Sequence, residues 1–96
     1  MNETEKYPDE YTEHYLAMYA VNYDSHNDDN FSRMASSYKN VEGSEYFRNA
    51  LLEFDAIIEN CDWKYLALIA QENEMADFGK EQFVRMVQIA KQVLKN

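Results

Sequence analysis

Few side chains of this sequence are of the kinds that act as nucleophile or base in enzymes. It contains one cysteine, Cys61, and two histidines, His14 and His26, and neither histidine lies near Cys61 in the sequence. Nucleophilic catalysis needs a nucleophile, a base beside it and a group that orients the base. We interpret both histidines as separate surface residues and Cys61, beside apolar neighbours, as a small buried packing residue. Because no pair of Asp and Glu residues stands out by its spacing, the sequence predicts no catalytic residue and no enzyme.

Metal and cofactor sites are equally weakly represented. Structural zinc takes four Cys or His ligands, more than this chain can supply. A polar loop places Asp24, His26 and Asp28 at alternate positions, as a calcium loop does. However, Asp29 stands where that loop requires Gly, and Ala35 stands where it requires a bidentate Glu. Two glycines are too few for a Gly-rich phosphate loop. We therefore predict no metal ion and no cofactor.

Tyrosine is the most unusual feature of the N-terminal part, where it recurs every fourth residue: Tyr7, Tyr11, Tyr15, Tyr19 and Tyr23. On an α-helix these side chains form a stripe that drifts by about 40° per step, because four residues overshoot one turn. We expect the last three to edge the core. Tyr7 and Tyr11 lie outside the apolar pattern and alternate with Asp9, Glu10 and Glu13. Tyrosine is a common interface anchor because it offers a large area, few rotatable bonds and a hydroxyl.

The charge of the chain is strongly negative and uneven. Asp and Glu number 18 against 9 Lys and Arg, which gives a net charge of −9. Residues 1–30 hold eight acids and one base, whereas residues 79–96 hold one acid and four bases. Such a charge repels nucleic acid and anionic membranes. The predicted partner is therefore a basic protein, although solubility alone would also explain an acidic composition.

We predict that the partner is bound by tyrosines set among carboxylates. Nucleases and other nucleic-acid-binding proteins have basic grooves, in which carboxylates mimic phosphate and speed association by electrostatic steering. The predicted partner-binding residues are the first two tyrosines and acids of the N-terminal half: Tyr7, Tyr11, Glu10, Glu13, Asp24, Asp28, Asp29, Glu42 and Glu45.

The elements that position these residues are helices. Two glycines and one proline favour long helices over tight turns, and no run alternates strictly as a strand does. Apolar residues at helical spacing predict four main helices and one short one. Their ranges are 9–23, 31–38 (the short helix), 45–60, Asp62 to near Asn73, and 80–94. The sequence thus predicts a single all-α domain over 1–96, an irregular helical bundle in which 1–8 is a flexible lead-in.

Targeting signals are not evident in the sequence. The N-terminus has neither the basic nor the apolar segment of a signal peptide. The longest apolar run, residues 15–21, is far shorter than a membrane span. We expect a cytoplasmic protein that does not act on membranes.

The second half of the chain carries a resemblance to a known family. An apolar helix (Leu51, Leu52, Phe54, Ile57 and Ile58), the pair Asp62-Trp63 and a terminal helix (Phe83, Met86 and Val87) follow one another within 44–94. With its acidity and its aromatic-rich first helix, the chain resembles the immunity proteins of bacterial toxin systems, especially those of contact-dependent growth inhibition. The resemblance implies an inhibitor that caps a cognate toxin, often a nuclease, in the cytoplasm of the producing cell. It implies no particular binding residue.

Two other classes of protein fit the same observations. A phage-type nucleic-acid mimic that inhibits a restriction or CRISPR nuclease would also be acidic, but it should space its carboxylates like phosphates along a rod. An adaptor domain would bind a partner without inhibiting it. The sequence leaves the choice between them open, together with the oligomeric state.

Overall fold

The structure, a computed structural model, describes residues 6–96. Five α-helices make up most of this range, and none of its residues lies in a β-strand, which confirms the all-α prediction. In chain order the helices are α2 (Tyr11–Asn22), α3 (Asp28–Glu42), α4 (Ser44–Glu59), α5 (Trp63–Glu72) and α6 (Lys80–Lys95).

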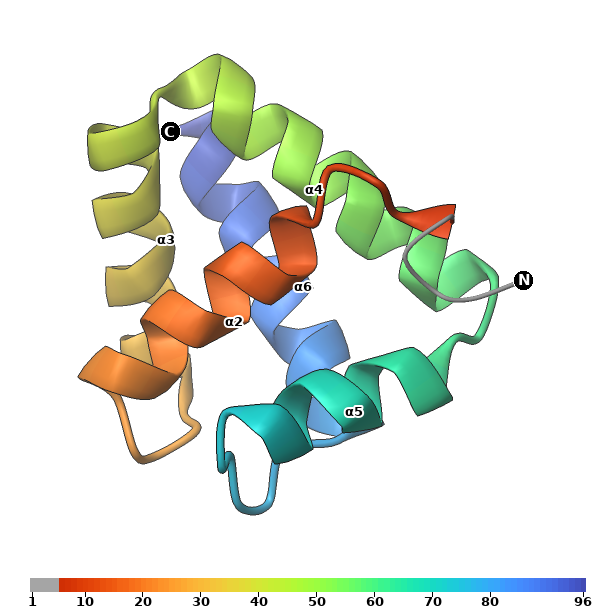
Figure 1. Cartoon of the computed structure of the whole chain (residues 1–96). Helices are drawn as coiled ribbons and strands as arrows, with labels where there is room; N and C mark the ends of the chain where they lie inside the picture. The colour runs from red at the N-terminus through yellow and green to blue at the C-terminus, as the bar shows by residue number, and fades with distance from the viewer. Residues whose placement is uncertain (1–5) are drawn as a thin grey trace.

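The bundle is arranged around α6. In Figure 1, α6 runs through the middle of the molecule behind α2, with α3 on one side, α4 above and α5 below. Its main packing partners are α3 and α4, while α2 packs on α4 and α5. The buried face of α6 consists of Phe83, Met86, Val87, Ile89 and Ala90. Burying one large side chain of this kind contributes about 1.5–3 kcal/mol, so this face holds the bundle together.

The helix predicted to be short, over 31–38, is longer in the structure. It begins at Asp28 because the side chain of Asn27 accepts a hydrogen bond of 2.9 Å from the backbone N–H of Asn30. Asn27 is therefore the N-cap of this helix. The helix continues to Glu42 and ends at Gly43, whose φ of 94° suits glycine.

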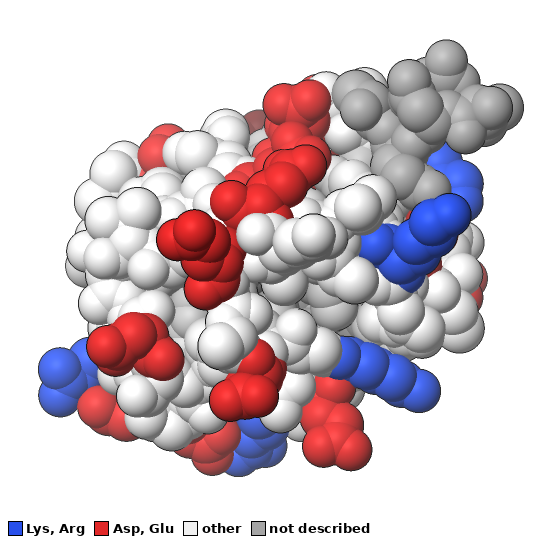
Figure 2. Space-filling model, turned by 60° about the horizontal axis from the view of Figure 1, so that its bottom comes forward, with Lys and Arg blue, Asp and Glu red and all other residues white. Residues whose placement is uncertain are grey.

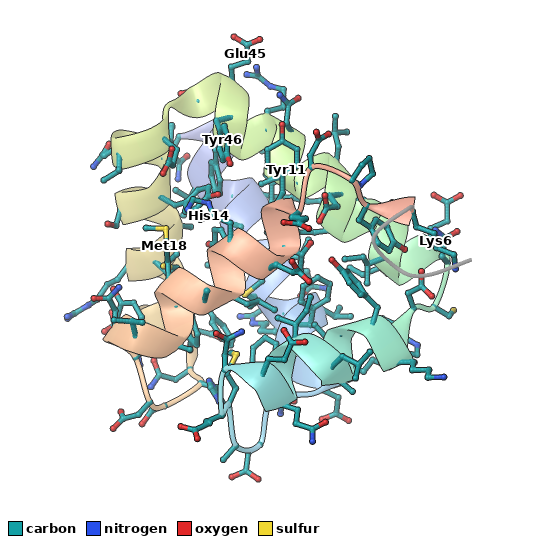
Figure 3. All side chains as sticks on the ribbon, viewed as in Figure 1. Lys6, Tyr11, His14, Met18, Glu45 and Tyr46 are labelled. Atoms are coloured by element: carbon teal, nitrogen blue, oxygen red, sulfur yellow. The ribbon has the colours of Figure 1, made fainter. Side chains whose placement is uncertain are left out.

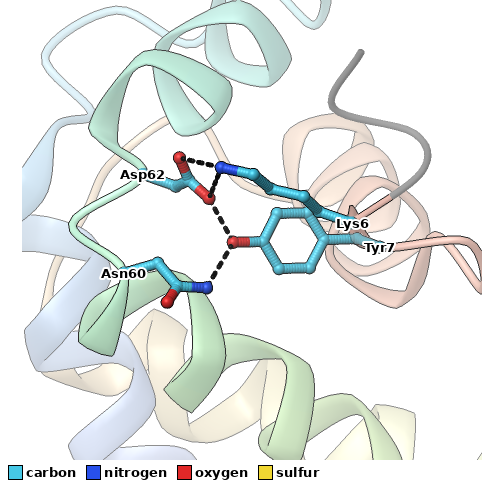
Figure 4. Close-up of polar contacts among 4 residues, drawn as sticks. All are labelled: Lys6, Tyr7, Asn60 and Asp62. Atoms are coloured by element: carbon cyan, nitrogen blue, oxygen red, sulfur yellow. Dashed lines mark hydrogen bonds and ion pairs between the residues drawn. The ribbon is translucent and has the colours of Figure 1, made fainter. Parts of the chain in front are cut away.

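Residues 1–8 were predicted to be a flexible lead-in, and the structure contradicts this at Tyr7. Residues 1–5 lie outside the described residues. Tyr7 is only 3% exposed, and its ring stacks on Tyr65 of α5 with 4.9 Å between ring centroids. The hydroxyl of Tyr7 donates a hydrogen bond to Asp62 and accepts one of 3.3 Å from the side chain of Asn60 (Figure 4). This residue therefore fastens the start of the chain to the α4–α5 junction.

That junction differs from the sequence prediction at Cys61. Cys61 is exposed rather than buried, and it adopts a left-handed backbone conformation with φ 54°. Its side chain therefore points away from the core at the sharp change of direction between the helices. Asp62 precedes α5 but makes no side-chain cap, because its carboxylate is bound by Tyr7 and lies 3.4 Å from the Nζ of Lys6.

Candidate functional site

The N-terminus of α2 is capped by a side chain from another helix. Glu10, the residue before α2, has φ 55° and makes no capping hydrogen bond. Instead, the carboxylate of Glu53 in α4 accepts hydrogen bonds from the backbone N–H of Thr12 at 2.8 Å and of Tyr11 at 3.3 Å. These groups have no partner within the helix, and the positive end of the helix dipole favours an anion. One carboxylate is thereby fixed against the first turn of α2.

Four carboxylates gather around this turn. They come from the residue before α2, from α2, from α4 and from α5, and we call them the acidic cluster: Glu10, Glu13, Glu53 and Glu72. The pKa of Glu13 is raised above its usual value by partial burial and by the negative charges of the other three. Figure 2, which brings the lower part of Figure 1 forward, shows one run of adjoining Asp and Glu side chains, with separate acidic and basic side chains around it.

No basic side chain within residues 6–96 forms an ion pair with the acidic cluster, whereas several other acids are paired. The paired acids are Asp28 with Arg85 at 2.6 Å, Asp29 with Arg33 at 3.0 Å, Asp55 with Lys91 at 2.7 Å and Asp62 with Lys6 at 3.4 Å. Among residues 6–96, no ion pair therefore offsets the negative charge of the cluster, which acts on whatever approaches this face.

A buried tyrosine lies beside the acidic cluster. Tyr65 is 4% exposed, and its hydroxyl has no hydrogen-bond partner in the described part of the chain. Its pKa is raised by burial and then by the charges of Glu13, Glu53 and Glu10, so this phenol stays protonated at neutral pH. A buried polar group without a partner costs about 1–3 kcal/mol, and such groups are rare in folded proteins.

Tyr11 is the member of the predicted tyrosine pair that remains accessible. It is half-buried and meets the ring of Tyr46 edge-on, with 4.9 Å between centroids. Figure 3 shows Tyr11 at the start of α2 and Tyr46 on α4 beside it. Tyr11 also lines an open cavity of about 440 Å³ together with Glu53 and the exposed Leu52. An aromatic ring, an apolar side chain and a carboxylate therefore adjoin one another there.

The prediction that Tyr7, like Tyr11, offers an exposed contact to a partner is wrong. Its ring is buried against α5 and its hydroxyl is used at the α4–α5 junction. The periodicity of four places Tyr7 in line with the other tyrosines, but the chain before α2 is not helical at residues 7–10. Helical spacing therefore does not predict the position of Tyr7, whose ring packs on Tyr65.

The remaining predicted acids do not belong to the acidic cluster. Asp28 and Asp29 are exposed but paired with bases, and Arg85 lowers the pKa of Asp28. Asp24 lies at the mouth of a separate small cavity between the α2–α3 and α5–α6 connections. Glu42 and Glu45 lie at the α3–α4 junction, and Figure 3 shows Glu45 at the opposite end of α4 from Lys6.

Both histidines are integrated into the fold rather than isolated on the surface. The Nδ1 of His14 is 2.8 Å from the hydroxyl of Tyr38. The Nε2 of His26 is 2.8 Å from the backbone carbonyl of Ala76, and its Nδ1 is 3.2 Å from the hydroxyl of Tyr19. His26 thus ties the α2–α3 connection to the α5–α6 connection, and neither ring lies beside Cys61.

Two members of the acidic cluster, Glu53 and Glu72, are missing from the predicted binding residues. The sequence held a usable signal for both, because each follows a core residue by three positions: Ala50 before Glu53, and Ile69 before Glu72. A carboxylate at that spacing lies at the border of the buried stripe of its helix. Border acids on two neighbouring helices can converge, which isolated surface acids do not.

Within residues 6–96, no group of three or more His, Cys, Asp or Glu side chains is placed to hold a metal ion. None of the helices in the same range is both long and apolar enough to cross a membrane. Comparison with known proteins finds no match to a family model, to a curated protein or to a solved structure.

Proposed function

We propose that this chain is an immunity protein that binds a basic bacterial toxin through the acidic cluster and neutralises it in the cytoplasm of the producing cell. The observation that carries the proposal is the convergence of four carboxylates on one face with no ion-pair partner among the described residues. Mutual repulsion of these charges opposes folding, and a bound cationic surface would relieve it.

A nuclease toxin has the complementary surface. An enzyme that binds nucleic acid attracts phosphates with Lys and Arg side chains, so the groove that must be blocked is basic. Unpaired carboxylates accelerate association with such a groove by electrostatic steering. The half-buried Tyr11, beside Glu53, supplies the aromatic anchor that commonly dominates the energy of an interface.

Nucleic-acid mimicry and adaptor function receive less support. A mimic needs carboxylates distributed along a rod, whereas four of the acids described here lie near one another and several others are paired with bases. An adaptor domain would bind its partner without neutralising it. A test that measures both binding and neutralisation separates the adaptor from the immunity protein.

The test uses the product of the gene next to the one that encodes this chain. Co-expression in a bacterial host should restore growth that this product alone prevents, and the two purified proteins should bind. The association rate should fall at least about tenfold between low and high salt, because salt screens exposed charges. Binding without growth rescue would support the adaptor, and a salt-independent association rate would contradict steering by the cluster.

Matched variants locate the surface. Glu10→Gln with Glu13→Gln removes two charges from the acidic cluster, and Asp28→Asn with Asp29→Asn removes two paired charges, so both double variants have the same net charge. We expect the first to slow association by about tenfold and the second by less than about twofold. Equal effects would show that only the net charge matters.

A further inference from the structure

An open cavity of about 440 Å³ borders the outer face of α4. Its volume lies within the range of about 300–1,000 Å³ that is usual for ligand sites. Residues 6–9 and Tyr11, the first residue of α2, contribute to its lining. The other lining residues recur on α4 at positions i, i+3, i+4 and i+7, so they share one face of that helix: Asn49, Leu52, Glu53 and Ala56.

Part of this lining is apolar and exposed to water. Leu52 is 64% exposed, and of the four large apolar side chains exposed within residues 6–96 it is the one that lines this cavity. Ala56 and the half-buried ring of Tyr11 line the same space. A single exposed leucine needs no explanation, but this one shares a cavity with an aromatic ring. A partner group with an aliphatic portion would therefore remove apolar surface from water when it binds.

The charged residues of the cavity are one base and two acids. The base is Lys6, whose Nζ lies 3.4 Å from the carboxylate of Asp62 at the α4–α5 junction. Neither Asp9 nor Glu53 forms an ion pair within the described chain. The carboxylate of Glu53 is fixed by two backbone N–H groups at the start of α2, and its oxygens can accept further hydrogen bonds. The cavity therefore presents negative charge beside apolar surface.

Resting on the proposed function, we infer that this cavity receives one arginine side chain of the basic partner. Its aliphatic stem lies on Leu52 and Ala56, and its guanidinium binds the carboxylates of Asp9 and Glu53. A guanidinium has five N–H donors, so one group can serve two carboxylates, and its plane packs on aromatic rings such as that of Tyr11. A lysine ammonium is compact, strongly hydrated and without a planar face, so it fits this lining less well.

The first test uses the full chain without its partner. The probes are Nα-acetyl-arginine amide and Nα-acetyl-citrulline amide, which have nearly the same shape although citrulline is neutral. Binding is followed by NMR at the backbone amides of Leu52 and Glu53. We expect saturable shifts at these amides, with the arginine probe binding at least about fivefold more tightly than the citrulline probe.

Three outcomes of this test would overturn the inference. One is the absence of saturable shifts at the amides of Leu52 and Glu53, and another is equal affinity for arginine and citrulline. The third is that Nα-acetyl-lysine amide or Nα-acetyl-leucine amide binds as tightly as the arginine probe, because the cavity would then select a different occupant.

Two pairs of matched variants locate the binding site. Asp9→Asn and Asp24→Asn each remove one exposed carboxylate, and of the two only Asp9 lines this cavity. Leu52→Ala and Leu68→Ala each shorten one exposed leucine, and of the two only Leu52 lines it. We expect the cavity variant of each pair to weaken the arginine probe by about threefold and its control by less than about 1.5-fold. Equal effects within a pair would overturn the assignment.

The outcome for the cavity can be separated from the outcome for the proposed function. If the arginine probe fails while the product of the neighbouring gene is still bound and neutralised, the proposed function stands and only the arginine assignment falls. If the probe binds as expected but that product is not bound, the toxin assignment falls, and the cavity remains a site for an arginine of another partner.

Discussion

The acidic cluster and the acids at the α3–α6 contact differ in what lies opposite each carboxylate. Asp28 at the start of α3 faces the guanidinium of Arg85 on α6, in a pair with N–O distances of 3.0 and 2.6 Å. Glu13 on α2 instead experiences the negative charges of three other carboxylates, those of Glu10, Glu53 and Glu72. The pKa of Asp28 is lowered by its partner, whereas that of Glu13 is raised by burial and by its neighbours. A carboxylate is thus paired with a guanidinium at the α3–α6 contact, whereas the carboxylate of Glu13 has no ion-pair partner among the described residues.

The contrast indicates which acids are available for a partner. An acid that already has a cation gains little from a second one, and separating the pair costs what the pair contributed. An acid among other acids gains from any cation that approaches, because repulsion is relieved at the same time. Net charge alone does not distinguish these two kinds of acid, and the acids of the cluster belong to the second kind.

The largest expected effect tests how the cluster is supported. Tyr7→Ala removes a buried ring that stacks on Tyr65 and is bound to Asp62. Its loss should lower the free energy of unfolding by about 3 kcal/mol, and Tyr7→Phe should lower it by about 1 kcal/mol. Denaturant unfolding measures both. A loss under about 0.5 kcal/mol for Tyr7→Ala would show that the lead-in does not anchor this region.

A smaller effect on stability should distinguish Glu53, which caps α2, from the other acids of the cluster. Because Glu53 caps α2 through the N–H groups of Thr12 and Tyr11, Glu53→Ala should destabilise the chain by about 1–2 kcal/mol. The other cluster acids have no such role, so Glu72→Ala serves as the control and should change stability by less than about 0.5 kcal/mol. Thermal unfolding in the presence and absence of salt measures both, and equal losses would contradict the capping role.

The sequence predicts the parts of the fold that depend on local pattern. The stripe of Phe47, Ala50, Leu51, Phe54 and Ile57 is buried on α4, as its helical spacing requires. The fully buried Tyr15 and Tyr19 confirm the same argument for α2. These helices are stabilised mainly by burial of one face, and the spacing of apolar residues in the sequence shows which face that is.

The contacts that make the site are not local, and helical spacing in the sequence does not say which residues meet. Glu53 and Thr12 are separated by 41 positions, and Arg85 and Asp28 by 57. Whether an acid meets a base, a helix N-terminus or another acid is set by how helices cross, which helical periodicity does not specify. For this reason the predicted binding residues include Asp28, which is paired with a base, and leave out Glu53, which caps α2.

A still smaller effect should appear at pH 7 with opposite signs in the two regions. Glu13→Gln removes repulsion and should raise the melting temperature by about 2 °C, a modest change because the group is mostly solvated. Asp28→Asn removes the partner of Arg85 and should lower the melting temperature. Calorimetry at low and at high salt measures both, and both differences should shrink as salt screens them. A change of the same sign in the two variants would contradict the comparison.

The pH dependence of stability sharpens the same contrast. Asp28 has a lowered pKa, so its contribution is present above its unfolded value, 3.8, and is lost as pH falls through the lower folded value. Glu13 has a raised pKa, so the folded chain holds that proton more tightly than the unfolded chain, and stability falls as pH rises above 4.5 through the folded value. Denaturant unfolding from pH 3 to 7 (about four units wide) should therefore show a smaller loss of stability on the alkaline side in Glu13→Gln and a smaller loss on the acidic side in Asp28→Asn. Parallel curves for the two variants would mean that the charges of the acidic cluster are no less compensated than those of the paired acids, and the basis for assigning this face to a partner would be lost.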